Sequence, residues 1–306
     1  MVRSGVFRGG VHAGRGGIAG GYCPARSAWG PGCRVVCQAT LPGPGWGTGK
    51  PGERLMVPRA SIVRTVTGAV PPPDGDDVTA GDDLLAEQVA YYRRRASEYD
   101  VTAFADLDAG RARITRVVAA LRPAGTVLEI ACGTGLWTGA LAKAATAVTA
   151  IDAAPEAIGI ARGRVQAAHV RFEVADVFTW QAAARFDTVF FAFWLSHVPA
   201  GRFDQFWRQL RGLLAGQGRV LFVDEHPDVR GKEVYEAGSA EIVHRRLGDG
   251  SEYRLVKVFV HPGQLRARLR PLGWHSRIRR DGDDWVIGEA RPAHRTGRTR
   301  GTSKIQ

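Results

Sequence analysis

The stretch from Val127 to Thr138 constrains the fold more than any other part of this 306-residue chain. An apolar run with one acid ends in the turn Cys132-Gly133-Thr134-Gly135, and a helix-prone segment follows. Glycine has no Cβ, so it lets the backbone approach a ligand closely and adopt angles that other residues resist. Seventeen residues beyond Gly135, a second apolar run ends in Asp152, whose carboxylate can accept hydrogen bonds from ribose hydroxyls. Together the two pieces predict a nucleotide site at the edge of a parallel sheet.

Apolar strand-like runs alternate with helical patterns along most of the chain. Strands are expected over 127–131, 147–151, 169–174, 187–193 and 219–223, with helices over 136–145, 155–167 and 203–214. Two earlier helices are indicated by apolar stripes, the first over 85–99 with its start at Asp82 or Asp83, and the second over 114–121. After residue 224 we expect strands over 253–260 and 285–289 around a helix over 262–271. This pattern predicts an α/β fold: a doubly wound, mostly parallel seven-stranded Rossmann-like sheet with an antiparallel C-terminal edge.

Glycine and proline are concentrated near the N-terminus. The first 80 residues hold 17 of the 39 glycines and 9 of the 16 prolines, and no apolar periodicity runs through them. Such a segment buries too little apolar surface to offset the entropy of ordering. We therefore expect residues 1–80 to be disordered, 81–290 to form one folded domain, and the tail 291–306 to be disordered. Met56 is the only methionine besides Met1, and the composition of 1–55 leads to the hypothesis that synthesis starts at Met56, which the intact mass of the native protein would test.

The net charge of +12 belongs mainly to the two ends of the chain. Residues 1–80 and 291–306 carry +5 each, which leaves +2 for the folded domain. A nearly neutral domain argues against a specific nucleic-acid partner, and basic ends are typical of solvated tails.

Cysteine and hydropathy patterns indicate a cytoplasmic protein without a membrane partner. Cys23, Cys33 and Cys37 lie in the first 80 residues, so the predicted domain keeps only Cys132 and has no disulfide framework. No apolar run has membrane-spanning length, and the N-terminus lacks the apolar stretch of a secretory signal. No metal site is predicted, and the sequence does not indicate the oligomeric state.

Three acids lie at or near the predicted strand ends: Glu129, Asp152 and Asp176. A dinucleotide site does not require all three, whereas a cofactor with a cationic methionine end, a ribose and an adenine does. The chain here resembles the class I S-adenosylmethionine-dependent methyltransferases, in particular small bacterial enzymes that act on small molecules, over about residues 90–290. The resemblance implies S-adenosylmethionine (SAM) as cofactor and a small-molecule methyl acceptor as partner.

In that family the glycine motif reads acid-x-Gly-x-Gly-x-Gly, which falls here on Glu129, Ala131, Gly133 and Gly135. The chain departs from the motif at Ala131, and since alanine resists positive φ we expect an ordinary strand-end backbone there. By the resemblance, Glu129 and the Gly133 and Gly135 backbone line the methionine end. Asp152 holds the ribose, and Asp176 with Val177 holds the adenine.

Two further segments resemble the family around the transferred methyl group. The helix that contains Tyr92 and Tyr99 resembles the lid over the cofactor, and these tyrosines either contact the cofactor or belong to the core. Phe193 opens the segment after the fourth strand, where an aromatic face can stabilise a sulfonium. In the same segment, His197 either serves as a base for a hydroxyl or amine acceptor or orders a neighbouring loop.

Two other functions remain open at this point. An NAD(P)-dependent oxidoreductase is disfavoured because Thr138 stands where Gly-x-Gly-x-x-Gly has its third glycine. A module that binds SAM without turnover is the second alternative. Nucleic-acid methylation is disfavoured, since no Asn/Asp-Pro-Pro-aromatic segment follows the fourth strand.

Overall fold

The structure of the chain is a computed structural model that describes residues 76–293. Most of the two segments expected to be disordered, 1–80 and 291–306, and the possible start at Met56 fall outside the described residues. Arg291 and Pro292 belong to the last strand, so the folded part extends beyond the end expected at residue 290. Residues 76–80 are helical, because the first helix, α1, begins at Asp76, ahead of the start expected at Asp82 or Asp83.

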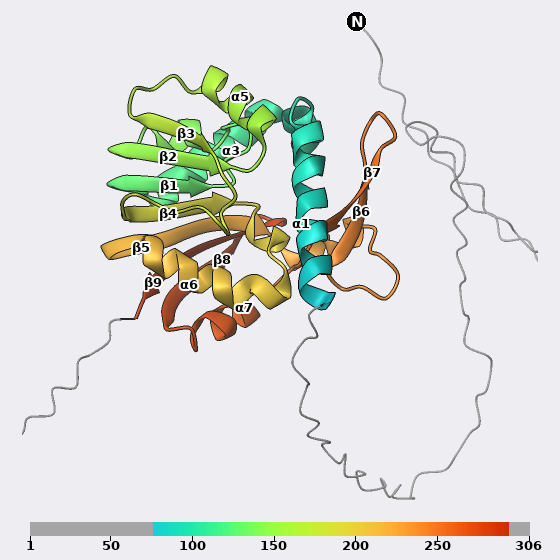
Figure 1. Ribbon diagram of the computed structural model, residues 1–306. Helices are drawn as coiled ribbons and strands as arrows, with labels where there is room; N and C mark the ends of the chain where they lie inside the picture. Colours follow the sequence, from blue (N-terminus) through green and yellow to red (C-terminus); the bar gives the residue numbers. More distant parts are fainter. Residues whose placement is uncertain (1–75, 294–306) are drawn as a thin grey trace, which may run out of the picture. The chain divides into compact units, whose positions relative to one another are not determined.

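A seven-stranded sheet in the order β3-β2-β1-β4-β5-β9-β8 forms the centre of the fold (Figure 1). β1 to β5 pair in parallel, whereas β9 pairs antiparallel with β5 and β8 pairs antiparallel with β9. The strands are β1 (Thr126–Ile130), β2 (Ala147–Asp152), β3 (Val170–Val174), β4 (Phe186–Ala192), β5 (Leu214–Glu225), β8 (Trp274–Asp281) and β9 (Trp285–Pro292). The predicted doubly wound sheet with its antiparallel C-terminal edge is confirmed.

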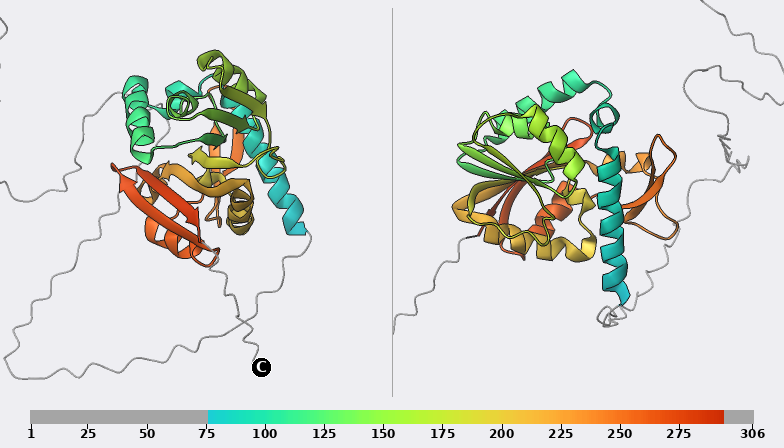
Figure 2. Two further views of the ribbon diagram at one scale, coloured as in Figure 1. Left: turned by 90° about the vertical axis from the view of Figure 1, so that its left-hand side faces the viewer. Right: turned by 45° about the horizontal axis from the view of Figure 1, so that its top comes forward.

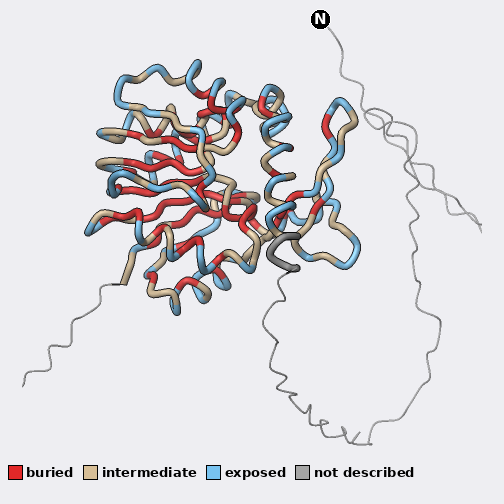
Figure 3. Tube along the Cα trace, viewed as in Figure 1, coloured by how far each residue is buried: buried red, intermediate tan, exposed pale blue. Residues whose placement is uncertain are grey.

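Helices cover both faces of the sheet and bury two apolar layers, which Figure 3 shows as buried segments along the strands. One layer contains α6 (Phe203–Leu213) and α7 (Pro262–Leu269), with Trp207 fully buried at its centre. The other contains α3 (Leu107–Leu121), α4 (Thr138–Leu141) and α5 (Pro155–Arg164). β4 is apolar along most of its length because it lies between these two layers.

Three strands of the C-terminal part differ from the sequence prediction, which had no strand over 242–246 or 274–281. The strand expected over 253–260 is β7 (Glu252–Val256), and it pairs only with β6 (Ile242–Arg246) in a separate hairpin rather than joining the main sheet. The seventh strand is instead β8, which was not predicted because it buries only Trp274 and Ile278 and is otherwise rich in arginine. β8 lies at the sheet edge, where charged side chains discourage pairing with another chain.

Helix α1 (Asp76–Arg95) stands across the carboxyl ends of the parallel strands, and the β6–β7 hairpin packs on its far side (Figures 1 and 2). The short helix α2 (Tyr99–Ala103) follows α1 and precedes α3. Three short 3-10 helices complete the order: η1 (Leu195–His197), η2 (Ala200–Arg202) and η3 (Pro227–Lys232). The chain order reverses between β1 and β4, so a crevice is expected at their carboxyl ends, directly under α1.

Candidate functional site

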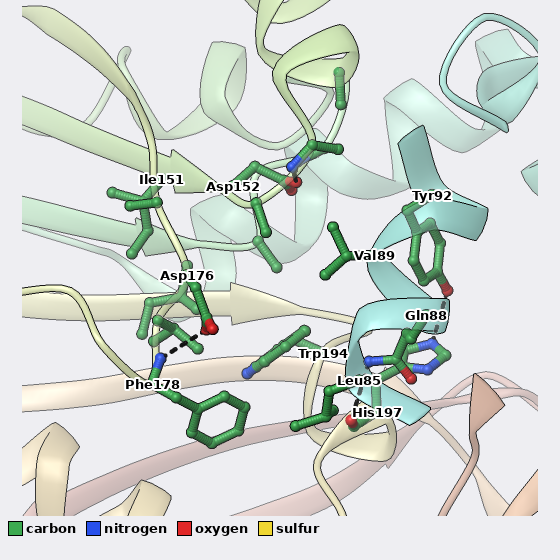
Figure 4. A pocket seen from close by; sticks show the side chains of 18 of the residues that line it. Leu85, Gln88, Val89, Tyr92, Ile151, Asp152, Asp176, Phe178, Trp194 and His197 are labelled. Carbon is green, nitrogen blue, oxygen red and sulfur yellow. Dashed lines mark hydrogen bonds between the residues drawn. The ribbon is translucent and has the colours of Figure 1, made fainter. Parts of the chain in front are cut away.

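A cavity of about 430 Å³ lies between the carboxyl ends of the parallel strands and α1 (Figure 4). It brings together most of the residues predicted for the site: Tyr92, Tyr99, Ala131, Gly133, Asp152, Asp176, Val177, Phe193 and His197. Glu129 and Gly135 do not line it. Glu129 is buried to 2% exposure within β1, and Gly135 packs against α5, where an added Cβ would lie 3.0 Å from Cβ of Ala161.

The glycine turn after β1 has three residues with positive φ: Ala131 at 53°, Gly133 at 54° and Gly135 at 81°. The ordinary strand-end conformation expected for Ala131 is therefore wrong. β2 holds the turn, because the Cys132 amide donates to the carbonyl of Ile151 (3.1 Å) and the Gly133 amide to the Asp152 carboxylate (2.8 Å). These bonds outweigh the roughly 1–2 kcal/mol that a left-handed conformation costs a residue with a Cβ.

The three strand-end acids have different surroundings. Asp152 accepts hydrogen bonds from the Gly133 and Ala154 amides, both at 2.8 Å, while burial raises the pKa of its carboxyl. Asp176 is exposed and accepts from the Phe178 amide at 2.9 Å. Burial raises the pKa of Glu129 to about 8, and its Oε2 atom has no hydrogen-bond partner within the described structure.

These surroundings fit a cofactor that carries an ammonium group, a ribose and an adenine. Glu129 does not line the cavity, but its Oε2 atom, buried without a partner among the described residues, is available to a cation that reaches behind the turn. A Cβ added at Gly133 would meet nothing within 4 Å, so the backbone is open to a ligand on the cavity side. Asp152 and Asp176 keep acceptor capacity beyond their backbone bonds, since each carboxylate oxygen can accept more than one hydrogen bond.

The segment after β4 reaches the cavity through another residue with a left-handed backbone conformation. Phe193 has a φ of 55°, and its amide donates to the carbonyl of Val223 at 2.8 Å. This bend places the ring of Trp194 across the cavity between Asp176 and His197 (Figure 4). Strained backbone of this kind is typical of functional sites.

His197 lies at the α1 end of the cavity with both ring nitrogens in contact. Nδ1 lies 2.7 Å from the carbonyl oxygen of Val256, and because a carbonyl only accepts, Nδ1 carries the proton. Nε2 therefore accepts from the Tyr92 hydroxyl, 2.9 Å away (Figure 4). Burial, followed by the charge of Lys257, lowers the pKa of His197 well below its ordinary value, so the ring is neutral.

Two buried polar residues at the α1 end of the cavity were not among the site residues predicted from the sequence. Gln88 of α1 donates to the His197 carbonyl (3.3 Å) and accepts from the Val256 amide (3.1 Å). Lys257 is 3% exposed and forms an ion pair with Glu225. Its Nζ atom donates to the Ser196 hydroxyl oxygen at 3.1 Å. Each carries a signal in the sequence: Gln88 lies on the apolar stripe of its helix, and Lys257 interrupts the apolar run 255–260.

The fold is a doubly wound sheet, and its glycine turn and the strand-end acids Asp152 and Asp176 lie around one cavity. This combination defines an α/β protein that binds an adenosyl cofactor. A family profile described as "Methyltransferase domain" matches residues 127–218. The solved DhpI–SAH complex is 38% identical, with a TM-score of 0.61, and the match covers 69% of this chain and 98% of DhpI. The DhpI–SAM–HEP complex gives 38% identity and a TM-score of 0.60, over 68% of this chain and 98% of that chain.

Curated relatives include the Ubiquinone biosynthesis O-methyltransferases of two bacteria. That of Xanthomonas axonopodis pv. citri (strain 306) is 34% identical over 167 residues, which are 53% of this chain and 67% of the relative. That of Xylella fastidiosa (strain 9a5c) is 35% identical over 155 residues, or 49% of this chain and 60% of the relative, so this chain spans less than two thirds of it.

The chain belongs to the class I SAM-dependent methyltransferases. It is an enzyme of the small-molecule type, and its cofactor is SAM. The oxidoreductase and the non-catalytic SAM-binding module are therefore set aside. Within residues 76–293 no cluster of side chains suits a metal ion, and no described helix is long and apolar enough to span a membrane.

Proposed function

We propose that this enzyme transfers the methyl group of SAM to an oxygen atom of a small acceptor that binds between α1 and residues 193–202. The curated relatives are named O-methyltransferases, which favours oxygen over nitrogen, sulfur or carbon. The observation that carries the proposal is the Tyr92–His197 hydrogen bond, which places a polar pair at the α1 end of the cavity.

In this proposal the strand-end residues hold the cofactor. Glu129, behind the turn, and the Gly133 backbone would hold the methionine end, Asp152 the ribose, and Asp176 with Val177 the adenine. The bound SAM supplies a methyl group on a cationic sulfur, which is already activated for displacement by a nucleophile. The chain contributes proximity, orientation and exclusion of water.

His197 orients Tyr92 in this mechanism rather than serving as the base. Both of its ring nitrogens are occupied, and Lys257, Arg245 and Arg95 all disfavour a positive charge on its ring. A protonated His197 would therefore be costly during turnover. The neutral ring accepts the Tyr92 proton in the free enzyme and so holds the hydroxyl at the cavity, and Gln88 fixes His197 through its carbonyl.

The same cations favour an acceptor oxygen that attacks as an anion. Arg245 pairs with Glu233 and Lys257 with Glu225, whereas Arg95 donates to the Thr102 hydroxyl and has no carboxylate within 4.0 Å among the described residues. Burial raises the pKa of the two phenols at this end, Tyr92 and Tyr99, by more than these cations lower it, so the acceptor must carry an oxygen that is already ionised in solution. The proposed acceptor class is thus a small molecule with an acidic oxygen and an apolar body.

A cytoplasmic location is part of the proposal, since the buried Cys132 is a free thiol.

Methyl-labelled SAM tests this function against a panel of phenols, carboxylic acids, amines and thiols. We expect label on oxygen, with a rate that rises with pH according to the pKa of the acceptor. Tyr92→Phe should raise the acceptor KM by about tenfold, because the Tyr92 hydroxyl, which donates to His197 in the free enzyme, would turn its proton to the acceptor oxygen. Tyr91→Phe is the matched control, because Tyr91 is buried against the β6–β7 hairpin and does not line the cavity. A product methylated on nitrogen or sulfur alone would contradict the proposal.

A further inference from the structure

Three side chains from three elements meet beside the glycine turn: Asp100 of α2, Thr134 of the turn and Arg164 at the end of α5. The Thr134 hydroxyl donates to Asp100 Oδ1 at 2.6 Å. Arg164 donates to the Thr134 carbonyl at 2.6 Å and to its hydroxyl at 2.9 Å, and it forms an ion pair with Asp100. Each member of this cluster, the Asp100–Thr134–Arg164 triad, therefore contacts the other two.

The triad is shielded from solvent, unlike most ion pairs between residues 76 and 293. Thr134 is 3% exposed, and the side chains of Arg164 and Asp100 are 24% and 17% exposed. The Arg93–Glu156 pair, which also joins the lid region to α5, has side chains that are 50% and 46% exposed. A shielded charge that loses its partner is more costly than an exposed one, so the triad holds its elements together more firmly than a surface pair does.

The triad joins α2 to the glycine turn that lines the cavity. Thr134 lies between the two glycines of the turn, Asp100 directly follows Tyr99, and both Thr134 and Tyr99 line the cavity. The guanidinium of Arg95 lies 4.9 Å from the centre of the Tyr99 ring and adds to its placement. Through Arg164, the turn and the lid are also tied to the helix that follows Asp152.

We propose that Asp100 and Arg164 are positioning residues that fasten α2 to the glycine turn through Thr134 and thereby set the affinity for SAM and for S-adenosylhomocysteine (SAH). This inference rests on the placement of the cofactor under the proposed function, but it does not depend on the acceptor. With the triad intact, Tyr99 and the Thr134 backbone stay in place along the cavity wall, and the cofactor leaves when the triad opens. Without it, α2 loses its side-chain link to the glycine turn and to α5.

Calorimetric titration with SAH measures the effect without any acceptor. Asp100→Asn and Thr134→Val should each raise the Kd for SAH by about tenfold, as expected for loss of a charge-assisted hydrogen bond in a shared network. The double variant should be only about as weak as the weaker single variant, because the two groups act together. Thr134→Ser keeps the hydroxyl and should restore an affinity within about twofold of the original chain.

Arg93→Gln is the matched control, since it breaks the exposed pair between α1 and α5 and leaves the triad intact. Its Kd for SAH should stay within about twofold of the original chain, even if its melting temperature falls. Circular dichroism and thermal melting verify that each variant is folded. Folded Asp100→Asn and Thr134→Val proteins that bind SAH within about twofold of the original chain would overturn the inference, and so would Kd changes that simply multiply in the double variant. An original chain that fails to bind SAH would instead contradict the cofactor placement itself.

Discussion

Replacement of Glu129 by glutamine changes the ionisation of a carboxyl group that the fold buries. The side chain is 2% exposed, and burial raises its pKa from 4.5 to about 8. Between these two pH values the folded chain keeps the proton that the unfolded chain has lost. Stability therefore falls as the pH rises through this window, by up to roughly 5 kcal/mol at 1.36 kcal/mol per pKa unit, and it changes no further above about pH 8.

Glutamine has nearly the shape of the protonated acid but does not titrate. Glu129→Gln should match the original chain in stability near pH 5 and exceed it near pH 8.5 by several kcal/mol, with roughly 5 kcal/mol as the upper limit. Urea unfolding followed by tryptophan fluorescence at a series of pH values gives the difference directly. Asp108→Asn is the control, because the Asp108 side chain is 93% exposed and its substitution should shift the whole curve little.

Cofactor binding gives a second measure of the same group. If the Glu129 carboxylate pairs with the ammonium group of SAM, binding near pH 7 releases a proton that the free enzyme holds. Calorimetry in buffers of different ionisation enthalpy should detect this proton for the original chain and not for Glu129→Gln.

The urea-unfolding experiment decides whether burial raises the pKa of Glu129. Parallel curves of unfolding free energy against pH for the two proteins, between about pH 5 and pH 8.5, would refute the reasoning from burial.

Three other substitutions test the remaining parts of the site. Asp152→Ala should weaken SAH binding by about 1–3 kcal/mol in calorimetry, and unchanged affinity would refute the ribose assignment. Ala131→Gly should stabilise the chain by about 0.5–1 kcal/mol in urea unfolding, because glycine relieves the positive φ at some cost in unfolded-state entropy; a loss of stability would contradict this. His197→Ala should cut kcat by about tenfold and leave the pH profile between pH 6 and 8 unchanged. A loss of a hundredfold or more, with a lost pH limb, would instead identify His197 as the base.

Local sequence patterns were sufficient for the sheet core and pointed to nine residues that line the cavity. The alternation of apolar runs and helical segments predicts the parallel strands, since buried strands between two helical layers are apolar throughout. The glycine turn and the acids Asp152 and Asp176 follow from the same register, because the carboxyl ends of parallel strands meet at one edge. The pairing of β7 with β6 and the edge strand β8 were not predictable, since pairing partners are chosen by contacts far apart in the chain.

The sequence alone determined which groups are available to bind a ligand. It places glycines where the backbone must approach the ligand, and carboxylates at successive strand ends. Only the tertiary structure decided how the groups are used. β2 forces Ala131 into a left-handed conformation, Val256 and Tyr92 occupy both nitrogens of His197, and Glu129 lies behind the turn with a raised pKa. Local preferences are set by neighbours in sequence, whereas protonation, strain and hydrogen-bond direction depend on what packing brings from elsewhere in the chain.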